Sequence, residues 1–62
     1  MFMMRCVLVE DELPAMEELA YILREYRDIE IVGREQDGKS ALAAIRELRP
    51  HAVFLDIDIP EI

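Results

Sequence analysis

Acidic residues directly follow two short apolar segments of this 62-residue chain. The segments span residues 6–9 and 52–55, and the acids that come after them are Glu10, Asp11 and Asp56, with Asp58 close behind. Carboxylate oxygens are ligands that Mg²⁺ prefers, usually one or two of them together with water and phosphate oxygens. A carboxylate beside such a cation can also attack phosphorus and form an aspartyl phosphate. The acids therefore predict a divalent-cation and phosphoryl site, if the fold brings them together.

The order of the residues suggests a role for each acid. Asp56 is the candidate nucleophile, because it is the first polar residue after an apolar segment. Glu10 and Asp11 are candidate metal ligands together with Asp56, and the backbone carbonyl of Asp58 is a further one. Carboxylates gathered in one place raise one another's pKa, and a divalent cation removes that penalty. The competing interpretation is that acids after strands only cap helices and solvate loops, and we adopt it for Glu12.

Three apolar runs predict the strands that would position these acids, over residues 3–9, 29–32 and 51–55. Glu30 interrupts the second run, which is typical of a half-exposed strand at the edge of a sheet. The first and third runs are continuously apolar, so we expect both of these strands to be central.

Two stripes of apolar residues at helical spacing predict helices between the strands. The first helix should open at residues 13–14, because the proline there suits a first turn, and should end near Tyr26. The second should span residues 38–48, with Asp37 as its N-cap and Gly33 in the turn before it.

This alternation of strands and helices predicts an α/β fold, because crossovers of this length permit only parallel pairing. The half-exposed second strand should lie outside the first, which gives the spatial order 2-1-3. The winding then reverses between the first and third strands, and ligands of such sheets bind at the carboxyl ends beside that point. We therefore expect Glu10, Asp11 and Asp56 to converge there.

Composition argues against several kinds of partner and location. The net charge of −7, from 14 acids and 7 bases, opposes contact with nucleic acid or an anionic membrane. No apolar run approaches the roughly 18 residues of a membrane span, and the first residues lack the order of a secretion signal. The lone cysteine, Cys6, suggests a reducing compartment. We expect a cytoplasmic location.

Several stretches of the sequence resemble the receiver domains of response regulators, especially those of the LytR/AlgR type. They are residues 7–15, residues 28–33 with 37–42, and residues 50–60. The full proteins of that type usually end in a DNA-binding domain. The resemblance implies a flavodoxin-like (CheY-like) fold, of which residues 1–62 form the N-terminal half without the fourth and fifth strands.

The resemblance also implies roles for single residues. Asp56 would accept a phosphoryl group from a sensor histidine kinase. Asp11 would bind Mg²⁺ directly, Glu10 mostly through a metal-bound water, and Asp58 through its backbone carbonyl. Such a module is phosphorylated in signalling and is not a turnover enzyme. The lysine of the family's fifth strand has no counterpart, because Lys39 begins a helix, so we expect this form to be impaired in signalling.

Two other functions stay open. A half-domain with an apolar third strand at its edge is expected to self-associate, most simply as a homodimer through that edge, and assembly would then be its only activity. Residues 54–58 also resemble the DxD motif of haloacid-dehalogenase-type phosphatases, with Asp56 as nucleophile and Asp58 as general acid. That second resemblance leaves Glu10 and Asp11 without a role.

Overall fold

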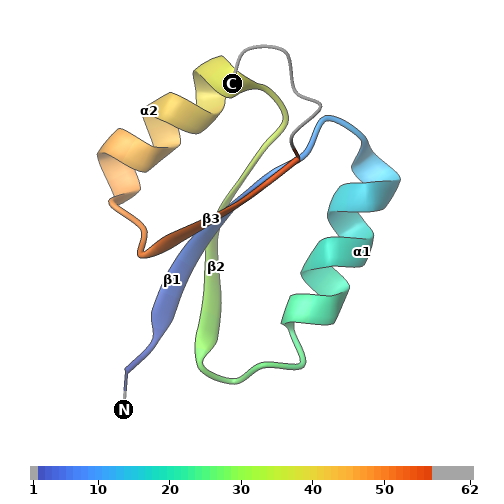
Figure 1. Cartoon of the computed structure of the whole chain (residues 1–62), viewed down its shortest axis with the longest axis vertical. Coiled ribbons are helices and arrows are strands. Elements are labelled where there is room, and N and C mark those ends of the chain that lie inside the picture. Colours follow the sequence, from blue (N-terminus) through green and yellow to red (C-terminus); the bar gives the residue numbers. More distant parts are fainter. Residues whose placement is uncertain (1, 57–62) are drawn as a thin grey trace.

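The computed structural model describes residues 2–56, along which strands and helices alternate. The elements are β1 (Met4–Val9), α1 (Leu13–Leu23), β2 (Ile29–Glu35), α2 (Gly38–Leu48) and β3 (Ala52–Leu55). The strands form a parallel sheet in the order β2-β1-β3, and α1 and α2 lie on opposite faces of it (Figure 1). The predicted α/β fold and strand order are confirmed, as in half of a flavodoxin-like receiver. No helix among the described residues is long and apolar enough to cross a membrane.

Strand β1 is buried on both of its faces. Cys6 and Leu8 pack in the cluster under α1, and Val7 and Val9 pack in the cluster under α2. All four are at most 1% exposed. A strand between two helical layers needs apolar side chains on both faces, which explains the uninterrupted apolar run of β1.

Helix α1 ends at Leu23, three residues before the predicted end at Tyr26. Its last turn tightens, since the backbone N–H of Tyr26 donates to the carbonyl of Leu23 rather than to a residue four positions back. Tyr26 is 54% exposed, so it adds no core contact that would extend the helix. Its carbonyl instead accepts the N–H of Ile29 and turns the chain into β2.

Helix α2 has the predicted bounds, and the predicted cap is confirmed. The Asp37 carboxylate accepts the backbone N–H of Ser40 at 2.8 Å. At the other end, Arg49 takes the left-handed conformation, with φ 48°, and donates its N–H to the carbonyl of Ile45. The Arg5 guanidinium of β1 donates to the carbonyls of Leu48 and Arg49, which the helix itself leaves unpaired.

Strand β2 is longer than predicted and includes Gly33, which we expected in a turn. Its register against β1 shifts by one residue, so that Cys6 pairs with Ile31 and Val7 pairs with Gly33. A Cβ at Gly33 would lie 3.2 Å from Leu48 of α2. The glycine therefore allows a close approach of α2 to a bulged strand, a use that its sequence does not distinguish from a turn.

Strand β3 starts at Ala52 and lies at an edge of the described sheet, which agrees with the predicted order 2-1-3 and differs from the expectation, drawn from its apolar run, that this strand is central. Within residues 2–56 it pairs with β1 alone. Its side chains alternate between half-buried and exposed, with Val53 39% and Leu55 41% exposed. An apolar run thus does not separate a central strand from an edge strand that lacks a second neighbour.

Candidate metal centre

The sheet brings the two groups of acids to one edge. Val9 and Leu55 are register partners at the ends of β1 and β3, and the backbone N–H of Asp56 donates to the carbonyl of Val9 at 3.0 Å. On the other side, the N–H of Glu10 donates to the carbonyl of Glu35 at 3.0 Å. Backbone hydrogen bonds to neighbouring strands therefore fix the positions of Glu10 and Asp56.

The side chains that follow these strands form an acidic cluster, which consists of Glu10, Asp11 and Asp56. One carboxylate oxygen of each lies within 4.8 Å of the others. Glu10 and Asp56 are half-buried, and Asp11 is exposed. Oxygens that share one Mg²⁺ ion lie up to about 4 Å apart, because each is about 2.1 Å from the ion. Small side-chain movements would thus let all three carboxylates contact one cation.

The electrostatics of the acidic cluster are visible at Glu10. The backbone N–H of Glu12 donates to its carboxylate at 3.1 Å, which lowers the pKa of Glu10. Desolvation and the neighbouring Asp11 and Asp56 carboxyls raise this pKa, and together they outweigh the hydrogen bond. The net shift is upward, because the ionised form is held beside two other acids. A divalent cation would relieve this repulsion.

Glu12 takes part through its backbone, which the sequence did not predict. It occupies the N-cap position of α1, but its side chain makes no capping hydrogen bond and is exposed. Its N–H instead orients the Glu10 carboxylate. A carboxylate two residues before an N–H at the start of a helix is the local signal for such a turn.

Two further residues, Asp58 and Lys39, are not part of the acidic cluster that the structure describes. Asp58 lies outside residues 2–56, so its predicted carbonyl ligand stays a prediction. Lys39 lies in the first turn of α2. The hydrogen bonds from Ser40 are the main cause that lowers the pKa of Asp37, and the backbone N–H and the charge of Lys39 add to it.

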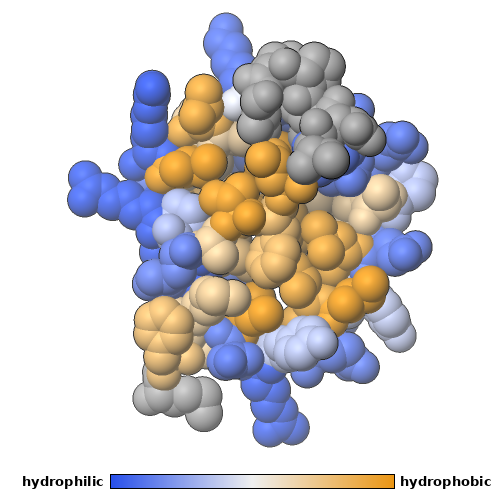
Figure 2. Space-filling view, in the orientation of Figure 1, coloured by the Kyte–Doolittle hydropathy of each residue, from blue (hydrophilic) through white to orange (hydrophobic). Residues whose placement is uncertain are grey.

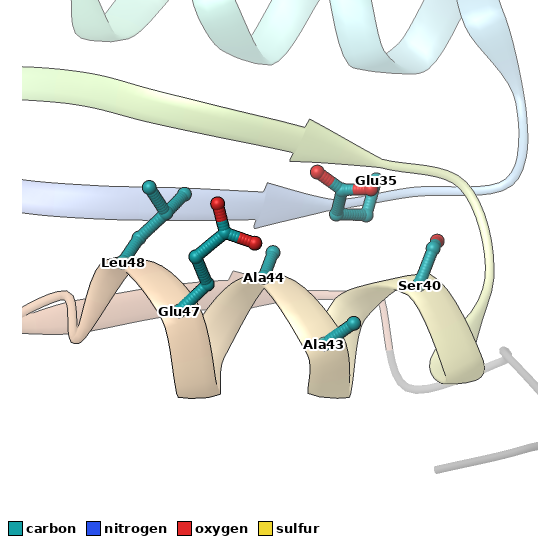
Figure 3. Close-up of a pocket in the computed structure, with 6 residues that line it drawn as sticks. All are labelled: Glu35, Ser40, Ala43, Ala44, Glu47 and Leu48. Atoms are coloured by element: carbon teal, nitrogen blue, oxygen red, sulfur yellow. The ribbon is translucent and has the colours of Figure 1, made fainter.

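A shallow hollow beside α2 is separate from the acidic cluster. It lies between α2 and the end of β2, with the Glu35 and Glu47 side chains at its rim (Figure 3). None of the three acids of the cluster lines it. Its lining residues are Glu35, Ser40, Ala43, Ala44, Glu47 and Leu48.

Relatives of known class match nearly the whole chain. The transcriptional regulatory protein YpdB of Escherichia coli K12 is 41% identical over 59 residues, which make up 95% of this chain and 24% of that protein. An uncharacterized response regulatory protein of Shewanella oneidensis is 47% identical over 60 residues, which make up 97% of this chain and 25% of that protein. The chain fits a fragment of a response-regulator receiver.

The chain also resembles the transcriptional regulatory protein BtsR of Escherichia coli K12, at 42% identity over 60 residues. It spans about a quarter of the length of each of these relatives. No family model matches the chain, and no solved structure matches it. The resemblance that rests on residues 7–15, 28–33, 37–42 and 50–60 is confirmed by these relatives.

Proposed function

We propose that this receiver fragment is a phosphoacceptor module of two-component signalling, in which Asp56 takes a phosphoryl group from a sensor histidine kinase in the cytoplasm. The observation that carries the proposal is the acidic cluster, in which oxygens of Glu10, Asp11 and Asp56 lie within 4.8 Å of one another. The response regulatory relatives support the same class. The module is a substrate of the kinase and not a turnover enzyme.

The donor set of the acidic cluster fits Mg²⁺. Three carboxylates with a raised Glu10 pKa form a site of excess negative charge, and hard oxygen donors select a hard cation. Glu10, Asp11 and Asp56 would hold the ion, and the carbonyl of Asp58 is a further proposed ligand. The bound ion would supply positive charge that offsets the negative charge on the phosphoryl oxygens during transfer.

The chemistry at Asp56 is a displacement at phosphorus. A carboxylate oxygen of Asp56 forms a bond to phosphorus, while the bond from phosphorus to the imidazole nitrogen of the phosphohistidine breaks and its electron pair stays on that nitrogen. The product is an acyl phosphate. The hydrogen bond from Asp56 N–H to Val9 keeps this residue at the end of β3, where its half-buried side chain faces the other acids.

Acetyl phosphate tests the proposal without a kinase, because attack by Asp56 breaks its phosphorus–oxygen bond and releases acetate. We expect the intact protein to gain the mass of one phosphoryl group in the presence of Mg²⁺, and to gain none with a chelator. Asp56→Ala should abolish the gain. Glu18→Gln is the matched control, since its side chain is exposed on α1 and lies outside the acidic cluster, and it should behave as the native chain.

The remaining outcomes separate the alternatives. A folded native chain that gains no phosphoryl group would overturn the proposal and favour a scaffold whose only activity is assembly. Release of inorganic phosphate from a generic phosphate ester would instead favour a phosphatase of the haloacid-dehalogenase type. A second copy of the chain stays a predicted partner.

A further inference from the structure

His51 lies where the chain leaves α2 and enters β3, and its imidazole contacts β1. Its Nδ1 accepts the backbone N–H of Arg5 at 2.9 Å, and its own backbone N–H donates to the carbonyl of Arg5 at 2.7 Å. His51 is the single histidine of the chain. Both backbone groups of Arg5 are thus bound by one residue that lies 46 positions away in the sequence.

The imidazole completes the hydrogen-bond ladder between β1 and β3. Successive residues of a strand point their backbone groups to opposite sides. Val9 accepts the N–H of Asp56 and so faces β3, and by this alternation Arg5 faces β3 as well. The register of the two strands begins at the pair of Cys6 with Ala52, one residue after Arg5. A side-chain nitrogen therefore supplies the acceptor at this first position, where a longer strand would offer a backbone carbonyl.

The turn before β3 explains why a side chain supplies this acceptor. Arg49 ends α2 in the left-handed conformation, with φ 48°, and Pro50 follows it without an N–H. The backbone is therefore still turning out of the helix just before it reaches Arg5. The Arg5 guanidinium donates to the carbonyl of Arg49 at 3.0 Å. Arg5 thus binds the turn through its side chain and the start of β3 through its backbone.

No side chain of β3 could take the place of the imidazole. Residues 52–55 are alanine, valine, phenylalanine and leucine, whose side chains contain no hydrogen-bond acceptor. Figure 2 views the molecule with β3 in front and shows apolar side chains gathered across the middle of this face, between the two helices. Within residues 51–55, pairing of the Arg5 N–H with a side chain therefore depends on His51.

The ring of His51 has a second contact, with Phe2, which precedes β1. The two ring centroids lie 4.9 Å apart, and the ring planes are tilted by 57°. Phe2 is 66% exposed, so this contact buries only part of its ring. An Nδ1 that accepts a hydrogen bond carries no proton, so the proton of the neutral imidazole lies on Nε2. Ring packing and the acceptor at Nδ1 are therefore two separable properties of this side chain.

The pairing of β1 with β3 also decides where Asp56 lies. Asp56 follows β3 directly, whereas Glu10 and Asp11 follow β1. The distances within the acidic cluster therefore depend on how firmly these two strands pair. Strand β3 has four residues, and a short strand opens from its ends. A hydrogen bond at the start of β3 limits this opening, and with it the movement of the acid at the other end.

We propose that His51 is a positioning residue for Asp56. Its Nδ1 holds the start of β3 to Arg5 of β1 and so keeps the carboxylate at the far end of β3 beside the other two acids. His51 does not touch the reacting atoms. The consequence for phosphoryl transfer rests on the proposed function of Asp56, whereas the hydrogen bond and the order of β3 can be measured without it.

Three substitutions separate the acceptor from the ring. His51→Asn places an oxygen where Nδ1 lies, because both atoms are bonded to Cγ, and so keeps the acceptor without the ring. His51→Phe keeps a ring against Phe2 without the acceptor, and His51→Ala removes both. We expect His51→Asn to behave as the native chain and the other two variants to share one defect.

Nuclear magnetic resonance of the isotope-labelled chain measures the hydrogen bond directly. A scalar coupling through the bond should join the amide nitrogen of Arg5 to Nδ1 of His51. The Arg5 amide should exchange its hydrogen with solvent about tenfold faster in His51→Phe and His51→Ala, because this end of the strand pair opens. The Asp56 amide lies at the other end of β3, so its exchange should quicken by a smaller factor, about threefold.

Acetyl phosphate then tests the consequence for the acidic cluster. The rate at which the chain gains a phosphoryl group in the presence of Mg²⁺ should fall about threefold in His51→Phe and His51→Ala, because Asp56 is less often in place. His51→Asn should restore the native rate. Circular dichroism of each variant shows whether it keeps the native helix and strand content, so unfolding is not read as a loss of position.

Three results would overturn the positioning role: no scalar coupling in the folded native chain, a His51→Phe variant whose Asp56 amide exchanges as slowly as that of the native chain, or a His51→Asn variant with the defect of His51→Ala. If His51→Phe and His51→Ala do not fold, the native coupling and the rescue by His51→Asn still decide. A native chain that gains no phosphoryl group would overturn the proposed function alone, because amide exchange still reports how β3 is held.

Discussion

Strand β1 has opposite surroundings at its two ends. At the amino end, Arg5 donates to the carbonyls of Leu48 and Arg49, and its backbone exchanges hydrogen bonds with His51, whose Nδ1 accepts the Arg5 N–H at 2.9 Å. At the carboxyl end, Glu10 lies beside two more carboxylates and its pKa is raised. One end thus pairs a charge with complementary dipoles, and the other gathers like charges.

This difference separates structural polar groups from candidate functional ones. The carbonyls at the end of α2 need donors in any folded state, and Arg5 supplies them with two hydrogen bonds. The acidic cluster satisfies no such need, because its members repel one another in the absence of a cation. A protein retains such a repulsion where a ligand relieves it, so the carboxyl end is the place to expect chemistry.

The largest effect on stability is expected at the amino end. Arg5→Met keeps an apolar stem but removes the charged donor to Leu48 and Arg49, and should lower the free energy of unfolding by about 2 kcal/mol. Denaturant unfolding measures the change. Arg46→Met is the matched control, because Arg46 lies in the last turn of the same helix and its side chain makes no hydrogen bond within residues 2–56. Equal losses in both variants would show that only the charge near the helix end matters.

At the carboxyl end, the change of stability should have the opposite sign. Glu10→Gln removes one of three like charges, so the variant should melt at a higher temperature than the native chain at pH 7 without metal. Added Mg²⁺ should raise the melting temperature of the native chain more than that of the variant. A variant that melts lower than the native chain under both conditions would contradict the proposed repulsion.

The pH dependence follows from the same shift. Because the pKa of Glu10 is raised in the folded chain above its ordinary value of 4.5, the folded state binds more protons than the unfolded state above that pH. The contribution of Glu10 to metal-free stability is therefore lost as the pH rises from about 4.5 through the folded pKa. In Glu10→Gln this part of the pH dependence should disappear from thermal melts.

The sequence predicted the surroundings of the carboxyl end of β1 better than those of its amino end, for physical reasons. Apolar runs and turn residues gave β1, α2 and the meeting of Glu10 with Asp56, since parallel strands must end at one edge of the sheet. The register shift at Gly33 was missed, because it depends on how closely α2 approaches β2. The role of Arg5 was missed as well, because the carbonyls that it caps lie over forty positions away in the sequence.

Strands β1 and β3 show a further reason why the sequence alone did not predict the whole sheet. Both are uninterrupted apolar runs, yet β1 has a neighbour on each side and β3 has one within the described residues. A strand's own residues record how much apolar surface it can bury, whereas its place in the sheet depends on which other strands are present. The exposure of Val53 and Leu55 is the visible consequence.

A third pair of variants tests whether an acid that follows β2 and has hydrogen-bond partners affects stability differently from Glu10. Asp37 caps α2, and the backbone and side chain of Ser40 are the main reason that its pKa is lowered. Stability from this cap is present above the ordinary pKa of 3.8 and is lost as the pH falls through the lowered pKa, opposite to Glu10. Asp37→Ala should lower the melting temperature at pH 7, whereas Asp37→Asn, which retains a capping oxygen, should restore most of it.

The smallest effect on the free energy of unfolding is expected at an exposed charge pair that lies at neither end of β1. Arg34 and Glu17 lie 3.2 Å apart, with side chains 45% and 73% exposed. Water screens such a pair, so Glu17→Gln should change the free energy of unfolding by less than about 0.5 kcal/mol. Urea unfolding at low and high salt checks this. A loss comparable to that of Arg5→Met would mean that simple pairing of charge, and not the capping of helix carbonyls, explains the stability of the amino end.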